Sequence, residues 1–88
     1  MRRVEFSSVA RRQLARVAKK RPELLSAVFE SVADLRLDPF GGLNKPEPLR
    51  GSYQGYWSIR LNKKDRLVYT VADDSILVYS VEGHYNDH

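Results

Sequence analysis

The hydrophobic period changes once along this 88-residue chain. In the first half, apolar residues recur every three or four positions, which places them on one side of an α-helix. From Tyr56 onward they alternate with polar residues, as in β-strands with one buried face. Helices followed by a run of strands favour an α+β fold. Because a chain of this length supports one modest core, we expect a single domain over residues 1–88.

Residues 2–6 favour a short opening strand, and two helices should follow it. Ser7 or Ser8 can start the first helix, because a serine oxygen accepts a hydrogen bond from a free backbone N–H. Pro22 suits the first position of the second helix, where its missing N–H costs nothing, and Asp38-Pro39 should end it. The expected buried residues are Ala10, Leu14, Val17 and Ala18 in the first helix and Leu25, Val28, Phe29, Val32 and Leu35 in the second.

The second half predicts three strands, over residues 56–61, 66–71 and 75–82. Residues 62–65 and 73–74 read as tight turns between them, and tight turns imply antiparallel pairing. The predicted architecture is therefore α+β, with an N-terminal strand and a helical hairpin packed on one face of a twisted antiparallel sheet.

Charge is distributed unevenly over the chain. Residues 1–21 carry a net charge of +7 and the remainder carries −3. A basic segment on a nearly neutral body favours a polyanionic partner such as nucleic acid, although a well-solvated helix face is an equal alternative. The absence of Cys excludes disulfides and thiolate zinc sites. No stretch reads as a signal peptide or a membrane span, so we expect a cytoplasmic protein without a membrane partner.

The segment from Lys45 to Arg50 carries the first candidate site residue. Two prolines flank Glu47 and hold it in an extended conformation, with Lys45 and Arg50 expected close by. Strand alternation places Arg60 and Arg66 on one half-exposed sheet face. Glu82 and His84 should lie on one face at the end of the last strand.

These residue types fit the cleavage of RNA through its own 2′-hydroxyl. Glu47 is a candidate base, Arg66 can clamp the phosphate bidentately, and His84 can protonate the leaving oxygen near neutral pH. Nearby cations lower the pKa of a carboxyl and make it a poorer base, so the alternative role for Glu47 is to orient the hydroxyl or hold Arg66 while another group takes the proton. Tyr85 could stack on a base or pack against the sheet. We expect neither a metal nor a cofactor, because the sequence contains no closely spaced ligand set or nucleotide-binding loop.

Four motifs in this order and spacing resemble the YoeB/Txe family of the RelE/ParE toxin superfamily. They are Lys45-Pro46-Glu47-Pro48-Leu49, Gly55-Tyr56-Trp57-Ser58, Arg66-Leu67-Val68-Tyr69 and His84-Tyr85. The resemblance implies a RelE/ParE-like fold and the toxin of a type II toxin–antitoxin module. Such toxins are ribosome-dependent endonucleases that cut mRNA in the decoding (A) site and thereby stop translation.

The resemblance also implies roles for individual residues and partners. Glu47 corresponds to the general base, His84 to the general acid and Arg66 to the phosphate-stabilising residue. The supporting residues would be Tyr85 and Arg60 in the active site and Lys45 and Arg50 along the RNA, with Arg11, Arg12, Arg16 and Lys19 facing ribosomal RNA. The implied partners are a cognate YefM/Axe-like antitoxin, the 30S decoding site with its mRNA, operator DNA through the antitoxin complex, and a second copy in a homodimer.

Two other functions compete with the endonuclease. A ParE-like toxin of the same fold would act on a protein such as gyrase without cleaving RNA, and a plain RNA-binding module would need only the basic helix. Two features depart from the family pattern. Asn86-Asp87-His88 follow the His-Tyr pair, and Glu82 stands where several relatives carry a basic residue. Its carboxylate could repel the message or raise the pKa of His84.

Overall fold

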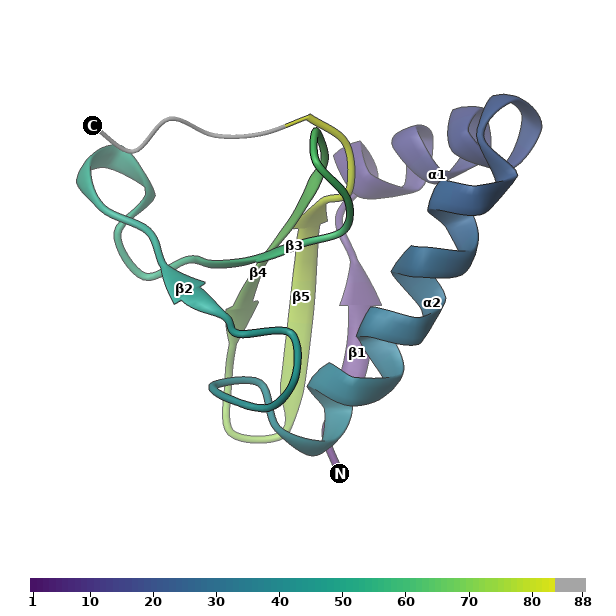
Figure 1. Ribbon diagram of the computed structural model, residues 1–88. Coiled ribbons are helices and arrows are strands. Elements are labelled where there is room, and N and C mark those ends of the chain that lie inside the picture. The colour runs from purple at the N-terminus through teal and green to yellow at the C-terminus, as the bar shows by residue number, and fades with distance from the viewer. Residues whose placement is uncertain (84–88) are drawn as a thin grey trace.

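The computed structural model of the protein describes residues 1–83, and the predicted site residues His84 and Tyr85 lie outside this range. Two helices and five strands make up the described chain (Figure 1). In chain order they are β1 (Arg3–Phe6), α1 (Ser8–Lys20), α2 (Pro22–Leu37), β2 (Glu47–Pro48), β3 (Trp57–Arg60), β4 (Arg66–Val71) and β5 (Ser75–Ser80), with a 3₁₀ turn at Gly51–Tyr53 between β2 and β3.

All five strands form one sheet in the order β1-β5-β4-β3-β2. The pairs β2–β3, β3–β4 and β4–β5 are antiparallel, whereas β1 pairs with β5 in parallel. The helical hairpin lies along the β1 side of the sheet (Figure 1). The predicted α+β class is confirmed. The position of β1 beside the last strand brings the start of α1 next to the end of β5.

The predicted helix boundaries are confirmed by local hydrogen bonds. The Ser7 hydroxyl oxygen accepts a hydrogen bond from the Ala10 N–H at 3.0 Å and caps α1. Pro22 is the first residue of α2, as predicted. The predicted faces were partly wrong, because Phe29 is 57% exposed and Leu24 is buried instead. Several apolar stripes fit α2 equally well, and its packing against α1 and β1 selects the one that is buried. The fully buried helix residues are Ala10 and Val17 in α1 and Leu24, Val28 and Leu35 in α2.

The strands differ from the prediction at two places. The last strand ends at Ser80 rather than at residue 82, because the next three residues turn toward α1 and the 62–65 turn, where they find polar partners. Glu47–Pro48 forms a short edge strand on β3. The prolines predicted its extended backbone, but they could not predict its pairing partner, which depends on where β3 lies.

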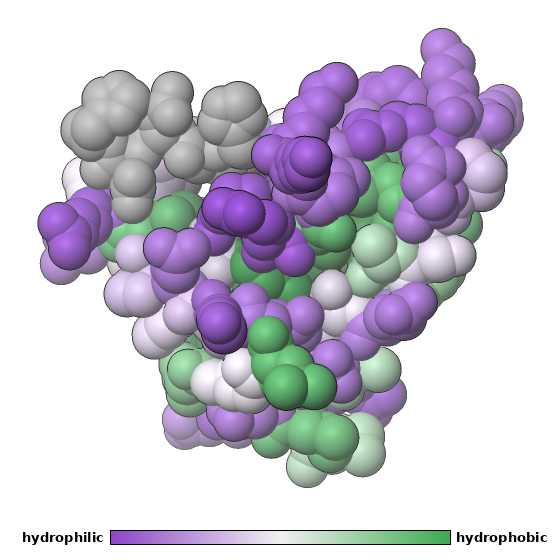
Figure 2. All heavy atoms as spheres, in the orientation of Figure 1, coloured by the Kyte–Doolittle hydropathy of each residue, from purple (hydrophilic) through white to green (hydrophobic). Residues whose placement is uncertain are grey.

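Apolar and polar surfaces lie at opposite ends of the molecule. Figure 2 shows hydrophilic residues gathered over α1 and hydrophobic residues at the other end. Phe40 contacts the Trp57 ring edge-on at 5.2 Å between centroids. The buried Tyr69 hydroxyl donates to the Pro39 carbonyl oxygen at 2.6 Å, and burial raises the pKa of Tyr69. Within residues 1–83, neither helix has the length and apolar character required to cross a bilayer.

Candidate active site

Strand register brings the predicted site residues onto one face of the sheet. Glu47 in β2 lies opposite Ser58 in β3, and Arg60 in β3 lies opposite Arg66 in β4. Side chains of one strand alternate between faces, so Ser58 and Arg60 share a face with their partners across the strands. The intervening residue Ile59 points into the hydrophobic core. The site therefore lies on the sheet face that is opposite to this core.

The guanidinium of Arg66 is held by two neighbouring strands. Its Nη2 donates to Glu47 Oε1 at 2.8 Å, and its Nε donates to Ser58 Oγ at 3.0 Å. The Arg66 side chain is 18% exposed and Ser58 is 1% exposed, so the partners fix the guanidinium at the edge of solvent. Arginine has five N–H donors, and among residues 1–83 no side chain or carbonyl oxygen accepts from the Nη1 donors of Arg66, which can therefore meet an anionic ligand.

Glu47 pairs with Arg66, as one of the predicted alternatives had it, and not with the cations next to it in the sequence. Its side chain is 67% exposed and pairs with Arg66, whereas within residues 1–83 it forms no ion pair with Lys45 or Arg50. Lys45 is not extended, although it precedes a proline. It has φ of +51° and its N–H donates to the Gly42 carbonyl oxygen at 3.3 Å. Lys45 therefore lies in a turn and does not have the extended backbone that is expected for a residue before proline.

The backbone ties the C-terminal end of the described chain to Arg66. The Arg66 N–H donates to the Gly83 carbonyl oxygen at 2.7 Å, and His84 follows Gly83 directly in the sequence. The prediction that His84 and Tyr85 belong to the site falls outside residues 1–83. Arg50 and Arg60 are exposed. With Arg66, Arg60 forms a pair of cations across β3 and β4 that can meet an anion.

The sequence predicted that Glu82 would belong to the last strand and lie on one of its faces, but this prediction is wrong. It follows the end of β5, and its carboxylate pairs with Arg16 and, at 3.8 Å, with Arg21 Nη1. Two arginines therefore neutralise Glu82. Arg16, which was predicted to face ribosomal RNA, is 53% exposed and pairs with Glu82. Arg11, Arg12 and Lys19 are exposed, and none of them has an ion-pair partner within the described chain.

Sequence reasoning missed Ser58 and Asp65. Serine is common in strands, so only the register showed that Ser58 faces Arg66. Asp65 was read as a turn residue, yet it is 1% exposed and bonded to Arg21. Within residues 1–83, no three His, Asp or Glu side chains come together as a set of metal ligands.

Comparison with known proteins gives a consistent result. Residues 8–85 match the family model described as the YoeB-like toxin of bacterial type II toxin–antitoxin system. A Streptomyces coelicolor protein named Toxin YoeB is 35% identical over 94% of this chain and 99% of its own length. A Synechocystis protein of the same name is 44% identical over 72% of this chain and 73% of its own length.

Solved structures show the same fold. YoeB from Staphylococcus aureus, described as a dimer, superposes with a TM-score of 0.86 at 29% identity and covers 96% of this chain and 98% of its own. A YoeB–YefM complex from the same organism gives a TM-score of 0.85 at 29% identity, covering 97% of this chain and 99% of that one. With a family match over nearly the whole sequence and the same sheet and helices, this chain belongs to the YoeB-like toxins of bacterial type II toxin–antitoxin systems.

Proposed function

We propose that this toxin is a ribosome-dependent endoribonuclease that cuts mRNA in the decoding site without a metal ion. The main support is the Arg66 guanidinium, held at the edge of solvent between Glu47 and Ser58. The backbone N–H of Arg66 donates to the Gly83 carbonyl oxygen, so the residue that precedes His84 in the sequence lies next to the backbone of Arg66. A base candidate and a phosphate clamp thus lie together on one sheet face, and the described chain ends at Gly83, the residue before His84.

The reaction needs only groups of the chain and the RNA. Glu47 takes the proton of the ribose 2′-hydroxyl, or orients that hydroxyl if another group takes the proton, and the 2′-oxygen attacks the adjacent phosphorus. The P–O5′ bond breaks, and His84 protonates the departing 5′-oxygen. The products are a 2′,3′-cyclic phosphate and a free 5′-hydroxyl. Each positioned acid or base contributes roughly 10²–10⁴-fold to the rate.

Arg66 supplies the electrostatic part of the catalysis. Negative charge builds up on the non-bridging phosphate oxygens during the attack, and a preorganised cation stabilises it without reorganising at that moment. Glu47 and Ser58 hold Arg66 in place before the substrate arrives. A bound phosphate would compete with the Glu47 carboxylate for the guanidinium, which would release Glu47 toward the 2′-hydroxyl. Tyr85 and Arg60 would support the site, and Lys45 and Arg50 would contact the RNA backbone.

The exposed cations of α1 are the proposed docking surface for ribosomal RNA. Arg11, Arg12 and Lys19 project from a helix that has no acidic residue in its first turn. Phosphate contacts release counterions, so ribosome binding should weaken steeply as salt rises from about 50 to about 200 mM. Co-sedimentation with ribosomes at these two salt concentrations tests this. An Arg11→Ala, Arg12→Ala and Lys19→Ala triple variant that binds like wild type would remove α1 from the interface.

The partner proteins are inferred from the relatives. A cognate YefM-like antitoxin is proposed to neutralise the toxin, because the related Staphylococcus aureus toxin was solved with YefM. Operator DNA would be contacted only through that complex. A homodimer is proposed on the same basis, from the related toxin described as a dimer.

The decisive experiment maps cleavage on ribosomes programmed with a defined message, by primer extension. Wild type should produce a discrete cut in the decoding site. His84→Ala should reduce the rate by about 10²–10⁴-fold, because it removes the proposed acid. His88→Ala is the matched control, since it removes the other histidine and should leave the rate unchanged.

Each other outcome identifies a different error. If folded wild type makes no cut, the endonuclease proposal fails and a gyrase-inhibition assay would test the protein-target alternative. If His84→Ala still cuts at the wild-type rate, RNA cleavage stands but the acid has been assigned to the wrong residue.

A further inference from the structure

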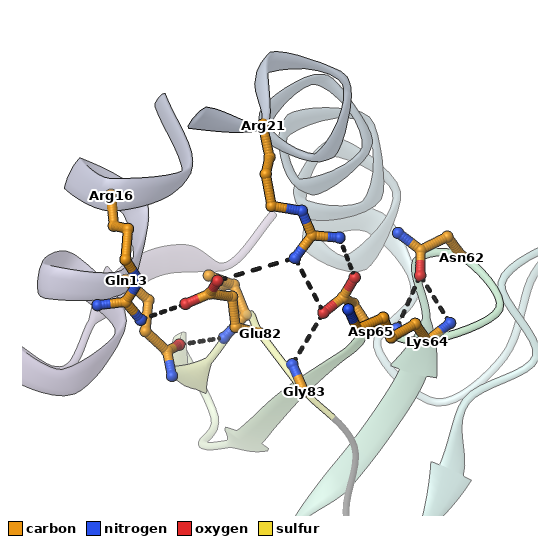
Figure 3. Close-up of polar contacts among 9 residues, drawn as sticks. Gln13, Arg16, Arg21, Asn62, Lys64, Asp65, Glu82 and Gly83 are labelled. Atoms are coloured by element: carbon orange, nitrogen blue, oxygen red, sulfur yellow. Dashed lines mark hydrogen bonds and ion pairs between the residues drawn. The ribbon is translucent and has the colours of Figure 1, made fainter. Parts of the chain in front are cut away.

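The three residues between β5 and His84 are held individually by side chains from distant parts of the chain (Figure 3). The Val81 N–H donates to Gln13 Oε1 at 2.7 Å. The Glu82 carboxylate pairs with Arg16 and Arg21. The Gly83 N–H donates to Asp65 Oδ1 at 2.9 Å. We refer to the holding side chains as the C-terminal clasp, which consists of Gln13, Arg16, Arg21 and Asp65.

Asp65 is the centre of the clasp. Its side chain is 1% exposed, and Arg21 grips it through two nitrogens, with Nη2 at 2.5 Å from Oδ2 and Nη1 at 3.4 Å from Oδ1. Burial alone would raise the pKa of the Asp65 carboxyl, but hydrogen bonds from Arg21 and Gly83 lower it to about 2. The carboxylate is therefore charged at neutral pH. Such a buried charge is tolerated only when partners satisfy it fully.

Gly83 is fixed from both sides by consecutive residues of the chain. Its N–H bonds the Asp65 carboxylate, and its carbonyl oxygen accepts from the Arg66 N–H at 2.7 Å. Its φ of +79° lies in the left-handed region that favours glycine. The two bonds define the position and direction of the chain at the last residue before His84.

We propose that Asp65, gripped by Arg21, is a positioning residue for the catalytic segment: it fixes Gly83 relative to Arg66, and so sets where His84 enters the site. This rests on the proposed endonuclease function. Asp65 is not itself catalytic, since its carboxylate is buried and occupied by Arg21 and Gly83. Its effect on the reaction would pass through His84.

If the pair of Asp65 and Arg21 served only to stabilise the fold, it would not need to be an ion pair that also bonds the Gly83 N–H. Buried ion pairs are often no more stabilising than well-packed apolar side chains of similar volume. What an apolar pair cannot supply is a directed acceptor for the Gly83 N–H. General acid catalysis depends on placement, and an error of about 1 Å can cost about 10²-fold in rate. Because the clasp fixes the direction of the chain at Gly83, we expect it to affect the rate of RNA cleavage as well as the stability of the fold.

The test is a double-mutant cycle between Asp65→Asn and His84→Ala, read as single-turnover cleavage on programmed ribosomes well below the melting temperature of each variant. Asparagine keeps the shape but cannot satisfy both Arg21 and Gly83. We expect Asp65→Asn to slow cleavage by about 10–100-fold when His84 is present. In the His84→Ala background, the same substitution should slow the residual cleavage less than about 2-fold, because the positioned acid is already gone.

Val28→Ala is the matched control, since Val28 is fully buried in α2 outside the clasp. It should lower the melting temperature but leave the cleavage rate of the folded protein unchanged. The inference is overturned if Asp65→Asn cleaves at the wild-type rate, if it slows cleavage equally in both backgrounds, or if Val28→Ala slows cleavage as much.

A second measurement needs no substrate and separates this inference from the proposed function. Hydrogen exchange at the Gly83 amide should be at least about tenfold faster in Asp65→Asn than in wild type, and unchanged in Val28→Ala. Equal exchange in wild type and Asp65→Asn would show that Asp65 does not hold Gly83. If wild type fails to cut RNA, the proposed function fails with the catalytic part of this inference, and the exchange rate alone decides whether the clasp fixes the chain.

Discussion

Two arginine–carboxylate pairs involve consecutive residues of the chain, Asp65 and Arg66, but differ in how far they are exposed to solvent. Asp65 reaches Arg21 at 2.5 Å, and Arg66 reaches Glu47 at 2.8 Å. In the first pair the carboxylate is 1% exposed, whereas in the second it is 67% exposed. Asp65 ends the 62–65 turn and Arg66 begins β4, so the two side chains go different ways: Asp65 is buried against Arg21, and Arg66 lies on the open face of the sheet.

The difference in exposure determines what each pair can do. An exposed pair contributes little to stability, because water screens the charges and solvates each one separately. The same exposure leaves Glu47 and Arg66 accessible to a substrate. A buried pair is costly to break, because removal of one partner leaves an uncompensated charge. We therefore expect substitutions in the Glu47–Arg66 pair to affect cleavage and those in the Arg21–Asp65 pair to affect stability first.

The largest effect should come from Arg66→Ala. Loss of the phosphate clamp should reduce cleavage on programmed ribosomes by about 10³-fold, or about 4 kcal/mol, while the protein stays folded by circular dichroism. Arg3→Ala is the control, because it removes an arginine from an exposed pair with Glu5 on β1. If Arg66→Ala retained a tenth of the wild-type rate, Arg66 would not be the clamp.

Asp65→Asn should have the next largest effect, on the free energy of unfolding. We expect a loss of about 3 kcal/mol, because the substitution leaves Arg21 without its buried partner. Glu47→Gln should change the same quantity by no more than about 0.5 kcal/mol, because its carboxylate is exposed. Urea denaturation of both variants measures the contrast. If both variants lost a similar free energy of unfolding, solvent exposure would not explain the difference between the two ion pairs.

Acid should weaken the buried pair over a defined pH range. The pKa of the Asp65 carboxyl is about 2 in the folded protein, below the ordinary aspartate value of 3.8. The unfolded chain therefore takes up the proton first, so this stabilisation is fully present above about pH 4 and is lost as the pH falls toward 2. It amounts to about 2 kcal/mol. Denaturation curves of wild type and Asp65→Asn should converge over this range, and parallel curves would contradict the assignment.

Ser58→Ala should give the smallest effect. It removes the hydroxyl that holds Arg66 Nε but leaves the bond to Glu47. Cleavage should fall about 10-fold, equivalent to about 1.4 kcal/mol, because the guanidinium loses one of its two anchors. Ser31→Ala in α2 is the control, since Ser31 is also buried but lies on a helix. An unchanged rate in Ser58→Ala would mean that Glu47 alone holds Arg66.

Much of the fold was predictable because its signals are local. The helix cap at Ser7, the break before Pro22 and the alternation in β3 and β4 each depend on a few neighbouring residues. The exposed Phe29 was predicted wrongly, because helical spacing shows that a stripe exists but not which of two overlapping stripes meets the sheet.

The candidate site was predicted less completely. Glu47, Arg60 and Arg66 were found from residue type and strand alternation, and the register brings them to one face. The pair between Glu47 and Arg66 was one of the predicted alternatives, whereas the expected closeness of Lys45 and Arg50 gives no ion pair within residues 1–83. Ser58 was missed, since nothing local distinguishes a serine that faces an arginine.

The helix and strand segments, the basic first helix and the residue types of the proposed site can all be read from the amino-acid sequence. These properties depend on hydrophobic periodicity, composition and short motifs, all of which are set by residues that are close together in the chain. The burial of Asp65 against Arg21 and the turn of Glu82 toward α1 depend instead on how the helices and strands pack. Such pairings join residues up to 66 positions apart. They form only after packing has brought the strands and helices together. A carboxylate such as that of Asp65 is removed from water only by the assembled core, and its ion pair depends on that burial.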